Sequence, residues 1–175
     1  MKSHMIKKSY IHFILFTFAF SNLSGADWPV WGGDGSRNMV SNEKNITFNF
    51  SPGEMNDDEV VNMKTTKNLK WVAKLGSQAY GNVTIGNGCV FIGTNNESPR
   101  DDGKKGDRGI VMCLDEKTGE LKWQLVIPKL GAGKVSDWEY IGICSSTAIE
   151  GDKVYVVTNR CEVVCLDING MANGN

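Results

Sequence analysis

The features of this sequence that could do chemistry are carboxylate side chains, thiol side chains and a short glycine-rich loop. Asp101, Asp102 and Asp107 lie in one charged stretch and could bind calcium. That stretch lacks the spacing and the terminal glutamate of a calcium loop, and four basic residues are interleaved with the aspartates. A solvated loop is therefore the favoured interpretation. Residues 130–135 lack the first glycine and the Ser/Thr of a phosphate loop, so no nucleotide site is assigned there.

Histidine is confined to His4 and His12, close to the start of the chain. If a leader containing both is removed, the mature chain has no histidine. Ser-His-Asp and Cys-His catalysis and His-ligated metals then have no residue to use. The commonest hydrolytic and metal-dependent designs are excluded on that reading.

The chain has 5 cysteines, an odd number, so at least one is unpaired or pairs between chains. On a strand, Cys161 and Cys165 would share one face but lie about 13 Å apart, too far for a disulfide. Cys144 and Cys161 flank a predicted hairpin and form the disulfide that we favour. For Cys113 and Cys165, which sit in apolar runs, a role as small buried residues stays open.

Residues 1–26 have the features of a secretory signal peptide. Three lysines precede an apolar run over residues 11–20, and Ser24-Gly25-Ala26 follows as a cleavage-like end. The run is too short to span a bilayer, so we expect an exported protein, periplasmic or secreted, with no integral membrane segment after removal. An uncleaved N-terminal anchor is the alternative.

The charge balance bears on the partners. The sequence has 19 basic and 20 acidic side chains, and the leader carries lysines but no acids, which makes the mature chain net acidic. Without a basic excess or a basic run, nucleic acid and anionic membranes are not expected as partners.

From residue 68 onward the pattern predicts an all-β domain of short antiparallel strands, which spans residues 68–175. Apolar and β-branched runs alternate with turn residues, including an Asn-Gly hairpin signal at Asn87-Gly88. Residues 27–67 are predicted to form an N-terminal segment with one strand near 46–50, followed by a polar loop. The strands predicted after it are 69–75, 82–85, 89–94, 110–114, 121–127, 145–149, 153–158 and 161–166.

The sequence contains an internal repeat. Cys-Leu-Asp at 113–115 returns at 165–167, and Trp71 returns as Trp123, both at an offset of 52 residues. Residues 90–95 match 154–159 at an offset of 64, and the difference falls in the long loop 96–109. A period near 50 with about four strands per unit is typical of propeller blades.

The pattern Asp115-x-x-Thr118-Gly119-x-x-x-Trp123 resembles the tryptophan-docking motif of pyrroloquinoline-quinone (PQQ)-like β-propeller repeats, with Cys113 where alanine is usual. The aspartate and threonine can bond turn amides, the glycine supplies a positive φ, and the tryptophan fills the gap between adjacent blades. Trp71 would end an earlier copy. Asp167 opens a later copy that departs from the pattern, because residues 168–170 lack Thr-Gly.

The resemblance implies antiparallel four-stranded blades of an incomplete propeller, with two to three blades in what we expect to be a partial chain. The family includes quinoprotein dehydrogenases, the propeller lipoprotein of the outer-membrane β-barrel assembly machinery and many exported proteins of unassigned role. One hypothesis is a non-enzymatic binding or scaffold module whose partner is a protein or further blades.

The other hypothesis is the N-terminal part of a PQQ-dependent dehydrogenase that oxidises alcohols or sugars. PQQ and calcium belong to this second hypothesis alone. The family's dehydrogenases use an adjacent cysteine pair and a calcium set of Glu, Asn and Asp, and none of these positions can be matched here. No catalytic, cofactor or metal residue is therefore carried over.

Overall fold

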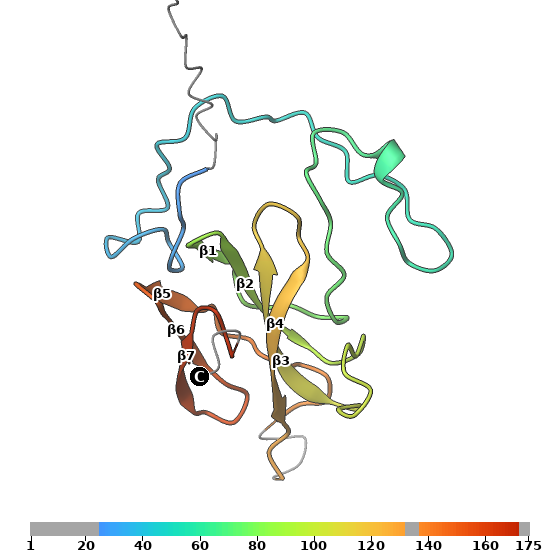
Figure 1. The fold of residues 1–175 in the computed structure, drawn as a ribbon, viewed down its shortest axis with the longest axis vertical. Coiled ribbons are helices and arrows are strands. Elements are labelled where there is room, and N and C mark those ends of the chain that lie inside the picture. Colours follow the sequence, from blue (N-terminus) through green and yellow to red (C-terminus); the bar gives the residue numbers. More distant parts are fainter. Residues whose placement is uncertain (1–24, 132–136, 172–175) are drawn as a thin grey trace, which may run out of the picture.

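The computed structural model describes residues 25–131 and 137–171, so the predicted signal peptide lies almost wholly outside the described residues. The described chain is nearly all β, with seven strands in two antiparallel sheets and a single turn of 3₁₀ helix at Met63–Thr65 (Figure 1). The all-β fold class predicted from the sequence is confirmed.

The first sheet has the order β1-β2-β3-β4 and consists of neighbours in sequence. β2 and β3 are buried along almost their whole length, because the sheet is covered on both faces. This explains their continuous apolar runs, which contrast with the alternation of a half-exposed strand. The strands are β1 Thr84–Gly86, β2 Cys89–Asn95, β3 Arg108–Asp115 and β4 Leu121–Pro128.

The second sheet has the order β5-β6-β7 and repeats the first three-quarters of this pattern. Phe91 faces Cys113 across β2 and β3, and Tyr155 faces Cys165 across β6 and β7, as the two sequence offsets require. The long loop between β2 and β3 is replaced in this sheet by a tight turn between β6 and β7. The single insertion that the two offsets indicate therefore lies in the loop of the first sheet. The strands are β5 Ala148–Glu150, β6 Lys153–Val157 and β7 Val163–Asp167.

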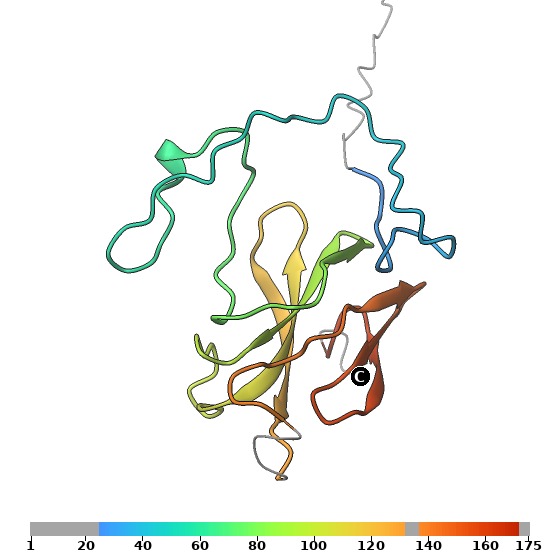
Figure 2. The ribbon, with the colours of Figure 1, turned by 180° about the vertical axis from the view of Figure 1, so that it is seen from behind.

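The two sheets pack against each other through a shared apolar core. Phe91 and Cys113 of the first sheet contact Ile149 and Val154 of the second. A neighbouring cluster joins Val111 to Val156. Both views of the ribbon show the sheets side by side, with the N-terminal segment arching over one end of them (Figures 1 and 2). Burial between the sheets, rather than ladder pairing, joins the two repeats.

Two predicted strands do not form. Residues 46–50 are irregular, and the N-terminal segment has only isolated bridges such as Ser51 with Lys67. Residues 69–75 are extended but belong to no ladder in the described chain. Their alternating side chains pack on a face of the first sheet, so the pattern reflects burial without a neighbouring strand to bond. No helix among the described residues is long and apolar enough to cross a membrane.

Candidate functional site

The turn between β3 and β4 is built by Asp115. Its carboxylate accepts 2.9 Å hydrogen bonds from the amides of Lys117 and Thr118, and its carbonyl accepts from the Gly119 amide at 2.8 Å. The hydrogen bonds to the carboxylate hold the pKa of Asp115 below its ordinary value, and the bond from the Thr118 amide has the largest effect. Gly119 has a φ of +75°, as predicted. The carboxylate is occupied with the turn and is not presented to a substrate.

Trp71 docks on this turn from 45 residues earlier in the chain. Its indole Nε1 donates to the Glu116 carbonyl at 2.9 Å, and the ring lies against Gly119. A Cβ added to Gly119 would lie 2.5 Å from the Trp71 ring. The glycine is thus required twice, for its positive φ and for the close approach of the indole.

Trp123 docks in the same way on the turn that follows β7. Its Nε1 donates to the Ile168 carbonyl at 3.0 Å, and the two residues are again 45 positions apart. The centroid of its ring lies 5.7 Å from the centroid of the Phe91 ring. A Cβ on Gly170, where φ is +62°, would lie 2.7 Å from the indole.

The expected divergence of the later copy after Asp167 is only partial. Asp167 accepts from the Asn169 amide at 2.7 Å, and Gly170 takes the place of Gly119 in a turn shorter by one residue. The missing Thr-Gly does not prevent docking, because a backbone carbonyl and a positive-φ glycine are sufficient. The structure therefore docks Trp71 on the turn that contains Asp115, Thr118 and Gly119, and it docks Trp123 on the turn that Asp167 opens.

A polar cluster lies at the other end of the strands. The side chain of Asp137 is only 2% exposed, and one of its oxygens contacts the Lys129 ammonium. Its second oxygen accepts hydrogen bonds from the Leu130 amide at 2.9 Å and from the Asn159 side-chain amide at 3.0 Å. Lys129 also lies 3.6 Å from Asp107. The cluster fixes the connection between the sheets.

Sequence reasoning missed this cluster, although the match of Asn95 with Asn159 in the repeat was a usable signal. Asn95 makes the corresponding link in the first sheet, where its amide donates to Ser77 at 2.9 Å.

The charged loop gives its aspartates separate partners. Asp101 lies 3.7 Å from Lys104 and Asp102 lies 3.5 Å from Lys105, while Asp107 accepts from the Tyr140 amide at 2.8 Å. No group of three or more acidic, cysteine or histidine side chains among the described residues could hold a metal ion.

All 5 cysteines are free thiols in the structure, so the predicted Cys144–Cys161 disulfide is not formed there. Cys144 is exposed ahead of β5, and Cys161 is exposed in the turn before β7. Cys113 is buried, as one interpretation held. Burial is the main cause that raises the pKa of its thiol, and the neighbouring Cys89 raises it further. Cys165 is exposed, so a buried role for it is wrong in this structure.

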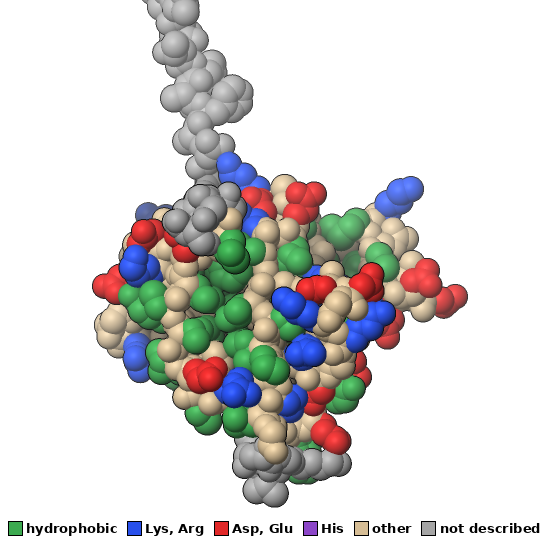
Figure 3. Space-filling model, turned by 60° about the horizontal axis from the view of Figure 1, so that its bottom comes forward, with side chains coloured by type: hydrophobic (Ala, Val, Ile, Leu, Met, Phe, Trp, Pro, Cys, Tyr) green, Lys and Arg blue, Asp and Glu red, His purple; other side chains and the backbone are tan. Residues whose placement is uncertain are grey.

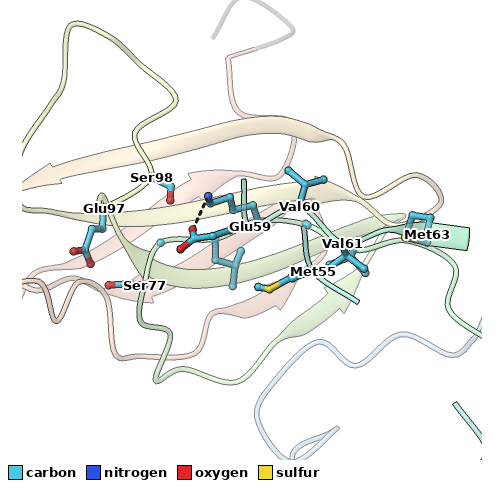
Figure 4. Close-up of a pocket in the computed structure, with 13 residues that line it drawn as sticks. Met55, Glu59, Val60, Val61, Met63, Ser77, Glu97 and Ser98 are labelled. Carbon is cyan, nitrogen blue, oxygen red and sulfur yellow. Dashed lines mark hydrogen bonds and ion pairs between the residues drawn. The ribbon is translucent and has the colours of Figure 1, made fainter. Parts of the chain in front are cut away.

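The free surface beside the extended segment 69–77 is the candidate binding site. A cleft of about 760 Å³ lies between residues 72–77 and the 55–63 region of the N-terminal segment. Figure 4 shows Met55, Val60 and Val61 along this cleft, with Glu97 and Ser98 further along it. The Glu59 carboxylate meets the Lys74 ammonium at 3.0 Å in this region. The lining is mainly aliphatic, with charge confined to a few positions.

A second, apolar groove of about 620 Å³ borders the same segment. It is lined by Trp71, Ala73 and Leu75 from the segment and by residues of β1 and β2, among them Ile85 and Val90. Val83 beside them is 43% exposed. An apolar groove next to an unpaired strand suits the binding of another protein surface better than that of a small polar ligand.

Two antiparallel sheets packed face to face, with Trp123 of the first docked on the turn after β7 of the second, make this an all-β protein. The arrangement is consistent with consecutive propeller blades. No family model matches the chain, and no curated protein sequence matches it. Among solved structures it is similar to BamB from Moraxella catarrhalis, at 23% identity and a TM-score of 0.34. That similarity covers 53% of this chain and 22% of the BamB chain, so this chain spans about a fifth of that protein.

Proposed function

We propose that the chain is an exported, non-enzymatic binding and scaffold module made of PQQ-like β-propeller blades, working in a bacterial periplasm or cell envelope. The observation that carries the proposal is the apolar groove beside Trp71, which lies between the first sheet and an extended segment that has no ladder partner among the described residues. Such a surface binds β-structure through backbone bonds and apolar side chains. The partner is a protein or further blades.

The motif residues support a structural role over a catalytic one. The Asp115 carboxylate is held by turn amides, and the Trp71 and Trp123 indoles are held by backbone carbonyls. Each of these side chains therefore fixes one repeat against the next. The signal-like residues 1–26 support export, which an alkaline phosphatase fusion to the full chain tests by its activity in the periplasm.

The binding surface is tested with a fluorophore that responds to its surroundings. The dye is placed on Val83→Cys, which lines the groove, and for comparison on Val40→Cys, which is 74% exposed in the N-terminal segment. Both variants are made in a chain whose exposed Cys144, Cys161 and Cys165 are replaced by serine, so that the dye reports on the introduced position. We expect a saturable blue shift from position 83, with added envelope extract or with rising chain concentration, and none from position 40. Equal responses, or none from either, would overturn the proposal.

The dehydrogenase alternative predicts a different result. PQQ and calcium are added to the full-length product of which this chain would be the N-terminal part, and dye-linked oxidation of alcohols or sugars is followed. Turnover above that of the free quinone would replace the scaffold proposal with the enzymatic one.

A further inference from the structure

A lysine lies over two buried thiols in the first sheet. The Lys122 ammonium donates a hydrogen bond to the Cys89 sulfur at 3.3 Å. Cys89 is 1% exposed and Cys113 is 0% exposed, and both belong to the core cluster between the two sheets. Most charged side chains on the face seen in Figure 3 project from the surface of the molecule. The Lys122 ammonium turns toward a buried sulfur instead, so its position needs a local cause.

An irregularity in the ladder between β3 and β4 gives Lys122 this position. Cys113 faces Trp123 across the ladder. The next pair is Leu114 with Leu121, so Lys122 faces no residue of β3. An extra residue of this kind is a β-bulge, which turns a side chain away from the regular alternation of a strand. In a regular strand Lys122 would point to the face opposite to Trp123, and the bulge brings it to the side of the thiols.

The ammonium and the two thiols influence each other. The hydrogen bond to Cys89 is the main cause that raises the pKa of Lys122, although burial acts in the opposite direction. Burial raises the pKa of the Cys113 thiol, and Cys89 raises it further, so Cys113 stays protonated. Lys122 is therefore the counter-ion of a thiolate formed at Cys89. Because the thiolate is the form of cysteine that reacts with oxidants, Cys89 is the reactive thiol of the pair.

The sheet geometry disfavours a disulfide between the two cysteines. Cys113 faces Phe91, which is two positions along β2 from Cys89. The cysteines are thus diagonal neighbours, whose Cα atoms lie about 7–8 Å apart in an antiparallel pair. A disulfide needs Cα atoms closer than about 7 Å, so the strands would have to move. The lysine stem is flexible, and its amine already touches the sulfur without any movement of the backbone.

From this arrangement we infer that Cys89 and Lys122 form a covalent S–N cross-link when the chain meets hydrogen peroxide. Lys122 is exposed, so a molecule little larger than water approaches the sulfur along the lysine stem, whereas a bulky thiol reagent does not. The site lies inside the first sheet, and the inference goes beyond the proposed binding function.

The reaction has two steps. The Cys89 thiolate attacks one oxygen of the peroxide, the O–O bond breaks, and the sulfur is oxidised to a sulfenic acid. The hydroxide that leaves takes a proton from the Lys122 ammonium and becomes water. The neutral amine then attacks the sulfur, the S–O bond breaks, and the hydroxyl group leaves with an amine proton as a second water. One peroxide is consumed for each S–N bond, and no other oxidant is needed.

The cross-link would join β2 to β4 across β3, which lies between them. It closes a loop from residue 89 to residue 122, and this loop contains the turn on which Trp71 docks. Closing a loop restricts the unfolded chain and so stabilises the folded one. Peroxide should therefore stabilise the first sheet, and a thiol reductant should reverse the effect by cleaving the S–N bond.

The test uses the full chain with Cys144, Cys161 and Cys165 replaced by serine, so that Cys89 and Cys113 are its remaining thiols. The folded chain is treated with a small excess of hydrogen peroxide, and the reaction is stopped with catalase. We expect a product whose mass is lower by two hydrogens and whose urea midpoint is raised. Dithiothreitol should restore the original mass and midpoint.

Peptide mapping identifies the bond. Cleavage after glutamate at positions 97, 116 and 120 places Cys89, Cys113 and Lys122 on three separate peptides. We expect the first and the third to be joined. A Cys89–Cys113 disulfide in their place would overturn the inference. So would a Cys89 that stays a thiol in the folded chain at a peroxide concentration that oxidises it in urea.

Two lysine variants separate the amine from the charge, with thermal melting to show that each is folded. Lys122→Arg keeps the positive charge, but it should lower the yield of the cross-link at least about tenfold, because a guanidinium does not lose its proton. Lys70→Arg is the matched control, since the Lys70 ammonium also makes a 3.3 Å hydrogen bond, to the Glu116 carbonyl. It should cross-link like the parent, as should Cys113→Ser. An equal yield in Lys122→Arg would overturn the inference.

Discussion

The indole of Trp123 is bonded to the carbonyl of Ile168 at 3.0 Å, and this bond ties the outer strand of one sheet to the turn of the next. Trp71 and Glu116 repeat the bond at 2.9 Å, with the same separation of 45 residues. The repeat is thus kept in a three-dimensional contact between blades, although the residues of the later turn have changed.

Trp123 should be the most sensitive position of this contact. Trp123→Ala removes an indole packed against Phe91 and the inter-sheet core, so we expect a loss of about 3–5 kcal/mol in the free energy of unfolding. Trp123→Phe keeps part of the packing but leaves the Ile168 carbonyl without its donor, at a cost of about 1–2 kcal/mol. Urea denaturation measures both. Trp138→Phe, at a 61% exposed tryptophan, is the control, and an equal loss there would refute the docking role.

Gly119→Ala and Gly88→Ala separate backbone strain from docking. The two glycines have similar φ angles, +75° and +72°. A Cβ on Gly88 meets nothing within 4 Å, whereas one on Gly119 would lie 2.5 Å from the Trp71 ring. Gly88→Ala should cost about 1 kcal/mol in free energy of unfolding, and Gly119→Ala should cost that amount and about 1–3 kcal/mol more. In a Trp71→Ala background the difference between the two variants should disappear. Its persistence there would show that the indole is not responsible.

Much of the fold could be predicted because local patterns and burial agree in the repeat. The continuous apolar run of β3 and the Asn-Gly turn at Asn87 have one structural interpretation each. Residues 69–75 were mispredicted because alternation reports which side chains are buried, and it does not report whether a neighbouring strand is present. The Lys129–Asp137 cluster was not predictable in the same way, since it joins loops whose contact is set by the packing of the two sheets.

The thiols provide a direct test of the cysteine arrangement. Cys89 and Cys113 are buried, while Cys144, Cys161 and Cys165 are exposed and free. In dilute solution a thiol reagent should therefore modify the three exposed cysteines of the folded chain and all 5 in denaturant. If export forms the Cys144–Cys161 disulfide predicted from the sequence, the exported protein will show two fewer reactive thiols and a mass lower by two hydrogens.

The buried carboxylate Asp137 should make stability depend on pH. Burial favours its neutral form, but hydrogen bonds from Lys129, Leu130 and Asn159 outweigh that effect and hold the pKa of Asp137 below its ordinary value of 3.8. A carboxylate whose pKa is lowered by folding adds stability above its ordinary pKa, and that stability is lost as the pH falls through the lowered value. Asp137→Asn should therefore reduce the free energy of unfolding by about 2–3 kcal/mol near neutral pH, because the half-buried Lys129 loses its closest partner.

The penalty of Asp137→Asn should shrink as urea unfolding is repeated at pH values falling further below 3.8, because protonation then removes the charge of the wild-type carboxylate as well. Asp102→Asn is the matched control. Its carboxylate is fully exposed and its ion pair with Lys105 is 3.5 Å long, so its effect should stay within about 0.5 kcal/mol at every pH. A penalty for Asp137→Asn that is the same at neutral and acidic pH would mean that the side chain stabilises the junction through packing and neutral hydrogen bonds. The ion pair with Lys129 would then contribute nothing measurable to holding the two sheets together.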